Sequence, residues 1–136
     1  MTSRENIKNT FQVFVDNDNL INVVITQGVN DVASNVAQAE LIRDDLLNIF
    51  KTENDKKFNC LIDLLALGTS AHYPSPQARQ IFSQLMENKR LLKIAVLAPS
   101  PLLRSIIQFI IILTNKKEKV EFFENKDTAL NWLYQQ

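Results

Sequence analysis

Two segments of the chain share a pattern that would suit anion binding. The pattern Ser-Pro-x-x-Arg begins at Ser75 and again at Ser100, and it places Arg79 and Arg104 in the first turn of a predicted helix. Serine is a favoured N-cap and proline suits the first helical position. Free N–H groups at a helix N-terminus, together with an arginine, could bind a phosphate or a carboxylate. The alternative, which we favour, is that each pattern simply starts a helix and that its arginine faces solvent.

The loop before the first of these patterns contains the only histidine of the chain. His72 lies beside Thr69, Ser70 and Tyr73, and an imidazole there could transfer protons or respond to pH. A hydrolase or transferase that uses His72 with Ser70 or Ser75 is therefore one hypothesis. The spacing of residues around His72 does not identify a nucleophile together with a carboxylate. An ordinary loop histidine is therefore the simpler interpretation, and we expect the protein not to be an enzyme.

The nearly unbroken apolar run 58–65 predicts a buried strand, as in a parallel sheet. Cys60 and Asp63 are three residues apart on it and so should point to opposite faces. Cys60 is then a small buried apolar residue. Asp63, near the strand end, should cap the following loop or, as the weaker alternative, serve a site.

Both Ser-Pro helices follow predicted strands, so their N-termini should meet at the carboxyl edge of the sheet, where open α/β folds bind ligands. The candidates for this binding rim are Thr69, Ser70, His72, Tyr73, Ser75, Arg79, Ser100 and Arg104.

Composition excludes several classes of protein. With 15 Lys and Arg against 15 Asp and Glu, the net charge of zero argues against a general nucleic-acid binder. One cysteine excludes an internal disulfide, and one cysteine with one histidine argues against a zinc site. The apolar runs are shorter than the roughly 20 residues of a membrane span, and the polar start lacks a secretory signal. We expect a cytoplasmic protein without a cofactor.

The order of predicted elements is β-β-α-β-α-β-α-β-α. Residues 1–10 should be loosely ordered, and 11–136 should form a single domain. Asx residues 16–19 predict the turn of an opening hairpin. The apolar positions of the long helix that follows are Val32, Val36, Ala39, Ile42, Leu46, Ile49 and Phe50. The fold class is α/β: a mostly parallel sheet of about five strands, with an antiparallel edge strand and about four flanking helices.

The predicted helix after Ser100 is apolar around nearly its whole circumference. Such a helix is either wedged between the sheet and its neighbours or forms a subunit interface or lipid contact, and we weigh these alternatives evenly. A homodimer is the simpler form of the second alternative. The interface candidates are Ile106, Ile107, Phe109, Ile110 and Ile111.

The chain resembles the SpoIIAA-like fold and, within it, the STAS/SEC14-type single-domain proteins of bacteria. The resemblance depends on the opening hairpin, the strand ending at Asp63, the strand 91–98, and the ending Val-Glu-Phe-Phe followed by Ala-Leu-Asn-Trp-Leu at 129–133. Anti-sigma-factor antagonists of this family carry a phosphorylated serine in an Asp-Ser pair. Here that pair is absent, and Thr69, Ser70 and Ser75 lie near its place without matching it.

The resemblance implies a non-enzymatic regulatory module that binds a protein partner through the rim, with self-association through the apolar helix. The alternative that it implies is a small-molecule or lipid-binding domain of SEC14-like type, which would accept an apolar or anionic ligand.

Overall fold

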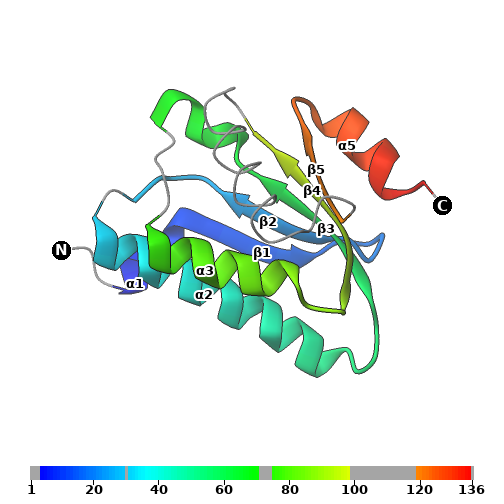
Figure 1. Cartoon of the computed structure of the whole chain (residues 1–136), viewed down its shortest axis with the longest axis horizontal. Coiled ribbons are helices and arrows are strands. Elements are labelled where there is room, and N and C mark those ends of the chain that lie inside the picture. Colours follow the sequence, from blue (N-terminus) through cyan, green and yellow to red (C-terminus); the bar gives the residue numbers. More distant parts are fainter. Residues whose placement is uncertain (1–3, 30, 71–74, 99–118, 136) are drawn as a thin grey trace.

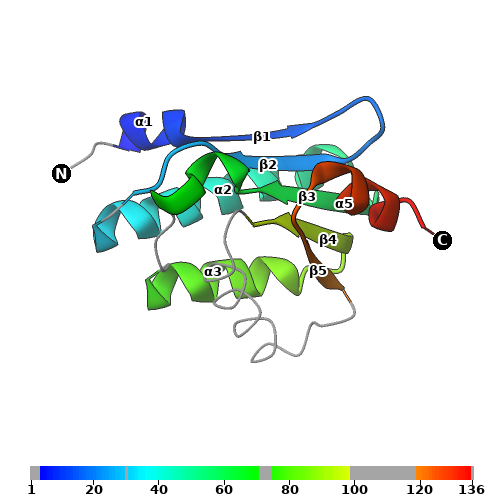
Figure 2. The ribbon, with the colours of Figure 1, turned by 90° about the horizontal axis from the view of Figure 1, so that it is seen from above.

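A five-stranded sheet forms the centre of the protein. The computed structural model describes residues 4–29, 31–70, 75–98 and 119–135. The strands are β1 (Phe11–Val15), β2 (Ile21–Ile25), β3 (Phe58–Asp63), β4 (Leu91–Leu97) and β5 (Val120–Phe123), and they lie in the sheet in that order (Figure 2). β1 pairs antiparallel with β2, and the other pairs are parallel. The predicted α/β fold with a mostly parallel sheet and an antiparallel edge strand is therefore confirmed.

The turn between β1 and β2 is closed by one carboxylate, as the Asx residues predict. Oδ1 of Asp16 accepts the backbone N–H of Asp18 at 2.9 Å and that of Leu20 at 3.1 Å. Its Oδ2 accepts Nδ2 of Asn22 at 3.1 Å. These hydrogen bonds hold the register of the hairpin because both strands are fixed to the same side chain.

The helices within the described residues are α1 (Arg4–Ile7), α2 (Val32–Thr52), α3 (Pro76–Met86) and α5 (Lys126–Leu133). Each of the three longer helices begins after a side-chain cap, namely Asp31, Ser75 or Asn125, which accepts the backbone N–H three residues later. The predicted Ser75 cap and Pro76 at the first helical position are thus confirmed, and the distance from Ser75 Oγ to the N–H nitrogen of Ala78 is 3.2 Å.

The described helices lie on both faces of the sheet. α2 and α3 run side by side along one face, and the larger hydrophobic core lies beneath them (Figure 1). α5 packs on β4, β5 and β3 over a smaller core, in which Ala95, Leu97, Ala129 and Leu133 are buried. Small alanines on β4 and α5 allow this helix to lie close to the sheet.

Helix α2 buries most of the apolar positions that the sequence predicts, namely Ala39, Ile42, Leu46 and Phe50, and departs from the prediction only near its start. Val32 is 60 % exposed and Val36 is half-buried, whereas the polar residues Ser34 and Gln38 are buried together with Ile42. The reason is that Gln38 finds hydrogen-bond partners inside the fold, so burying its carboxamide no longer carries the full cost of losing water.

Part of the N-terminal stretch that was expected to be loosely ordered is folded. Arg4–Ile7 forms one helical turn, and a 3-10 turn at Lys8–Thr10 leads directly into β1. Ile7 is only 1 % exposed, and α1 packs against α2. A single apolar side chain in a polar stretch is thus enough to anchor it to the core.

Candidate functional site

A cavity of about 140 Å³ lies between the sheet and the helix pair α2 and α3. Its floor is a row of side chains from three neighbouring strands: Val23 on β2 is paired with Ile62 on β3, and Ile62 is paired with Val96 on β4. Cys60 lies two residues before Ile62 on the same face of β3. The period of two along each strand brings these side chains onto one face of the sheet.

The two helices supply the walls of the cavity. From α2 come the apolar residues Ile42 and Leu46, and from α3 come the apolar residues Phe82, Leu85 and Met86. The apolar side chains of α3 therefore face the interior. The cavity is therefore bounded by apolar side chains of the sheet on one side and of the two helices on the other.

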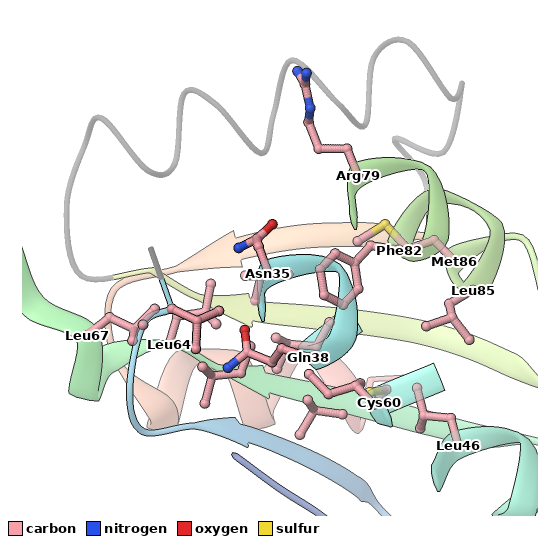
Figure 3. Close-up of a pocket in the computed structure, with 17 residues that line it drawn as sticks. Asn35, Gln38, Leu46, Cys60, Leu64, Leu67, Arg79, Phe82, Leu85 and Met86 are labelled. Carbon is pink, nitrogen blue, oxygen red and sulfur yellow. The ribbon is translucent and has the colours of Figure 1, made fainter. Parts of the chain in front are cut away.

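Three polar residues lie around one end of the cavity: Asn35 and Gln38 from α2, and Arg79 from α3. Figure 3 shows the oxygen of Gln38 pointing towards Asn35, while the guanidinium of Arg79 points away from the apolar floor (Figure 3). This polar end lies near the N-termini of α2 and α3. Among the described residues that line the cavity, Arg79 is the one charged residue, and none is an aspartate or a glutamate.

Hydrogen bonds fix the orientation of both carboxamides. Nε2 of Gln38 donates to Oγ1 of Thr10 at 2.9 Å and to the carbonyl oxygen of Gln27 at 3.3 Å. Oδ1 of Asn35 accepts the backbone N–H of Ser75 at 2.8 Å. The carbonyl of Gln27 can only accept and the N–H of Ser75 can only donate, so neither carboxamide can be turned over.

The thiol of Cys60 forms part of the floor but is chemically quiet. Cys60 is only 1 % exposed, and burial raises the pKa of its thiol from 9.0 to about 12. Since the thiolate is the reactive form, this side chain would not serve as a nucleophile near neutral pH. The interpretation of Cys60 as a small buried residue, pointing away from Asp63, agrees with this position.

Asp63 has a local structural role. Its Oδ1 accepts the backbone N–H of Leu65 at 3.0 Å, which confirms the predicted cap of the following loop. That loop is the 3-10 segment Leu65–Ser70, which is kinked at Gly68 with φ 53° and ψ −130°. A side chain is strained in this region of backbone conformation, so glycine is required there.

The structure describes only a part of the predicted binding rim. Ser75 caps α3, and Arg79 lines the cavity instead of lying on a fully exposed face. The backbone of Thr69 and Ser70 ends the 3-10 segment, and their side chains are outside the description. Outside the described residues lie His72, Tyr73, Ser100 and Arg104, and also the interface candidates Ile106, Ile107, Phe109, Ile110 and Ile111.

The residues that sequence reasoning missed are Asn35 and Gln38. A signal for Gln38 was present, because it lies four residues before Ile42 and eight before Leu46, on the same face of the helix. A polar residue on such an apolar stripe needs a partner inside the fold. Asn35 is three residues before Gln38 and is therefore its neighbour on the helix surface.

Other kinds of site receive no support within the described ranges. No cluster of metal-ligating side chains is found there. Nor is any helix of the described part both long and apolar enough to cross a membrane.

The chain was also compared with known proteins. A family model described as Domain of unknown function (DUF7793) matches residues 14–136, which include the whole sheet from Phe14 onwards and every residue that lines the cavity. The searches of curated proteins and of solved structures found no match.

Proposed function

The chain belongs to the DUF7793 family, and we propose that it binds a small, largely apolar molecule in the cavity between the sheet and helices α2 and α3. The observation that carries this proposal is the cavity itself. It is lined largely by apolar side chains, among them those of Val23, Ile62, Val96 and Phe82, and polar groups gather at one end. Apolar pockets with a few convergent polar groups are the usual form of a small-molecule site.

The size of the cavity limits the ligand. An apolar cavity of about 150 Å³ in another protein takes up benzene, and here the volume is about 140 Å³. The apolar body of the ligand should therefore contain roughly six or seven carbon atoms. Such a molecule is much smaller than a membrane lipid, so the small-molecule part of the SEC14-like alternative is favoured over the lipid part.

The proposal is for binding without a catalysed reaction. Two observations support it: the pKa of the Cys60 thiol is raised, and the two polar groups nearest the floor are the neutral carboxamides of Asn35 and Gln38. Neither carboxamide can act as a general acid or base near pH 7. The protein-binding STAS-type module remains a separate prediction, whose rim lies largely outside the described residues.

A pair of adjacent substitutions tests the proposal. Val23→Phe places an aromatic ring in the cavity, whereas Val24→Phe makes the same change one residue later, on the opposite face of β2, where the side chain is half-buried. Toluene is the probe, and methyl NMR resonances of Ile62 and Val96 report its entry. Toluene should shift both resonances in the native protein and in Val24→Phe, but not in Val23→Phe.

Two results would contradict the proposal. One is that toluene leaves the resonances of Ile62 and Val96 unchanged in the native protein. The other is that it shifts them equally in Val23→Phe. Thermal unfolding of both variants controls for folding, and Val23→Phe should be at least as stable as Val24→Phe because its ring fills existing space.

A further inference from the structure

The carboxamides of Asn35 and Gln38 each use one of their two ends in holding the fold. Gln38 commits its nitrogen to Thr10 and Gln27, and Asn35 commits its oxygen to Ser75. The hydroxyl hydrogen of Thr10 goes to the carbonyl oxygen of Ile7, at 2.5 Å, so Thr10 can only accept from Gln38. These hydrogen bonds therefore determine which atom of each carboxamide remains available to a ligand.

The remaining atoms are complementary. Gln38 retains the acceptor Oε1, and Asn35 retains the donor Nδ2 with two hydrogens. Among the described residues neither atom has a hydrogen-bond partner, although Gln38 is only 6 % exposed. Figure 3 shows the Gln38 oxygen pointing towards Asn35 and the Asn35 nitrogen on the side of Leu64 (Figure 3). Both residues line the cavity.

Unused polar atoms beside empty space differ from an isolated packing fault. Oδ1 of Asn59 is buried without a partner among the described residues, but Asn59 does not line the cavity. At Asn35 and Gln38, by contrast, a donor and an acceptor lie one helical turn apart, next to room for a ligand. A few polar groups that converge on an apolar pocket usually orient its ligand, and these two atoms are available to do so.

Resting on the proposed function, we infer that the ligand carries a neutral head group with both a hydrogen-bond donor and an acceptor, such as a primary carboxamide, which binds between Asn35 Nδ2 and Gln38 Oε1. A carboxylate would set its oxygens against the Gln38 oxygen, and an ammonium group would set its hydrogens against the Asn35 donor. Arg79 does not change this preference, because its guanidinium points away from the floor of the cavity.

Four probes that share one phenyl ring test the head group: toluene, benzamide, benzoate and benzylamine. Calorimetry of the native protein at pH 7 should show benzamide binding at least about tenfold more tightly than either charged probe, since a mismatched buried polar group costs a factor of ten or more. Toluene should also bind, because the apolar body is the same.

The variant Asn35→Asp changes only the unused end of the carboxamide. It keeps an oxygen for the N–H of Ser75 and replaces the donor Nδ2 with an acceptor. Benzamide should then bind at least about tenfold more weakly, while the affinity for toluene changes less than about threefold. Asn48→Asp is the matched control: the same change on an exposed position of the same helix, with no expected effect on any probe.

The outcomes separate the two proposals. If toluene does not bind the native protein, the proposed function fails and the head-group inference fails with it. If toluene binds but benzoate binds as tightly as benzamide, the inference is overturned while the proposed function stands. The same holds if Asn35→Asp leaves benzamide binding unchanged.

Discussion

The polar side chains at the two ends of helix α2 differ in how many of their hydrogen-bonding atoms have partners in the fold. At the C-terminal end, the guanidinium of Arg90 donates to the carbonyl oxygens of Phe50 at 3.0 Å, of Lys56 at 2.5 Å and of Glu53. It also lies over the ring of Phe50, 5.2 Å from its centroid. The last turn of a helix leaves carbonyls without intrahelical partners, and Arg90 binds that of Phe50 together with two carbonyls of the residues just beyond the helix.

At the N-terminal end, Asn35 and Gln38 bind the backbone and side chains around them with only half of each carboxamide. The other half faces a cavity instead of a partner. The difference is that each guanidinium nitrogen of Arg90 donates to a backbone carbonyl, whereas one polar atom of each carboxamide has no partner among the described residues. In the proposed function, these remaining atoms are the ones that a ligand in the cavity would contact.

The largest expected effect concerns Cys60, which forms part of the floor of the cavity. Because burial raises the pKa of its thiol from 9.0 to about 12, the thiolate fraction at pH 8 falls by about a thousandfold. Alkylation by iodoacetamide should be slower by about that factor in the native protein than in urea, and saturating toluene should slow it further. A native rate within tenfold of the unfolded rate would show a solvated thiol and no enclosed cavity.

The next largest effect tests the structural role of Arg90 at the C-terminal end of α2. Arg90→Ala removes the donors to three carbonyl groups and should lower the free energy of unfolding by about 3 kcal/mol, as measured by urea denaturation. Arg43→Ala is the control, since the partner of Arg43 among the described residues is its exposed neighbour Asp44, at 3.1 Å. That control should change the stability by less than about 0.5 kcal/mol. Equal effects of the two substitutions would refute the structural role of Arg90.

A smaller loss of stability should follow from Gln38→Leu, which removes the hydrogen bonds to Thr10 and Gln27. We expect about 1–2 kcal/mol, because the two acceptors lose a buried donor. Calorimetry should show weaker benzamide binding together with unchanged or tighter toluene binding. A parallel loss for both probes would mean that Gln38 shapes the cavity without contacting a head group.

The smallest expected effect on stability concerns Asp16. Both oxygens of its carboxylate accept hydrogen bonds in the β1–β2 turn. Its slight burial raises the pKa, but hydrogen bonds from Leu20, Asn22 and Asp18 outweigh this, so the pKa lies below 3.8. A lowered pKa means that the ionised carboxylate stabilises the fold at neutral pH and that this contribution is lost as the pH falls through the folded-state pKa.

Asp16→Asn tests that sign. At pH 7 the variant should be less stable than the native protein by under about 1 kcal/mol, because the group is largely solvated. Denaturation curves at successively lower pH should show this difference shrinking, because the native carboxyl becomes protonated as the pH falls through its folded-state pKa. A difference that grows towards low pH would contradict the direction of the shift.

Much of the fold could be predicted because its determinants are local. The turn at Asp16, the cap at Ser75 and the loop cap at Asp63 each involve partners within four residues, apart from the bond to Asn22. Strand alternation and apolar runs then determined the order of the elements.

The cavity could not be predicted in the same way. Gln38 bonds to a residue 28 positions earlier, and Asn35 to one 40 positions later. Whether a polar side chain on a helix is solvated or buried depends on such distant partners, and an empty volume depends on how three strands and two helices pack together. The sequence analysis therefore looked for chemistry at the loops, while the unused polar atoms lie within α2.

Native mass spectrometry of the freshly purified protein, beside Val23→Phe and Val24→Phe, tests most directly whether the cavity holds a natural ligand. The native protein and Val24→Phe should each carry the extra mass of one small neutral molecule, and Val23→Phe should be bare. The opposite result, with all three proteins bare or with the same mass retained by Val23→Phe, would contradict a ligand in the cavity.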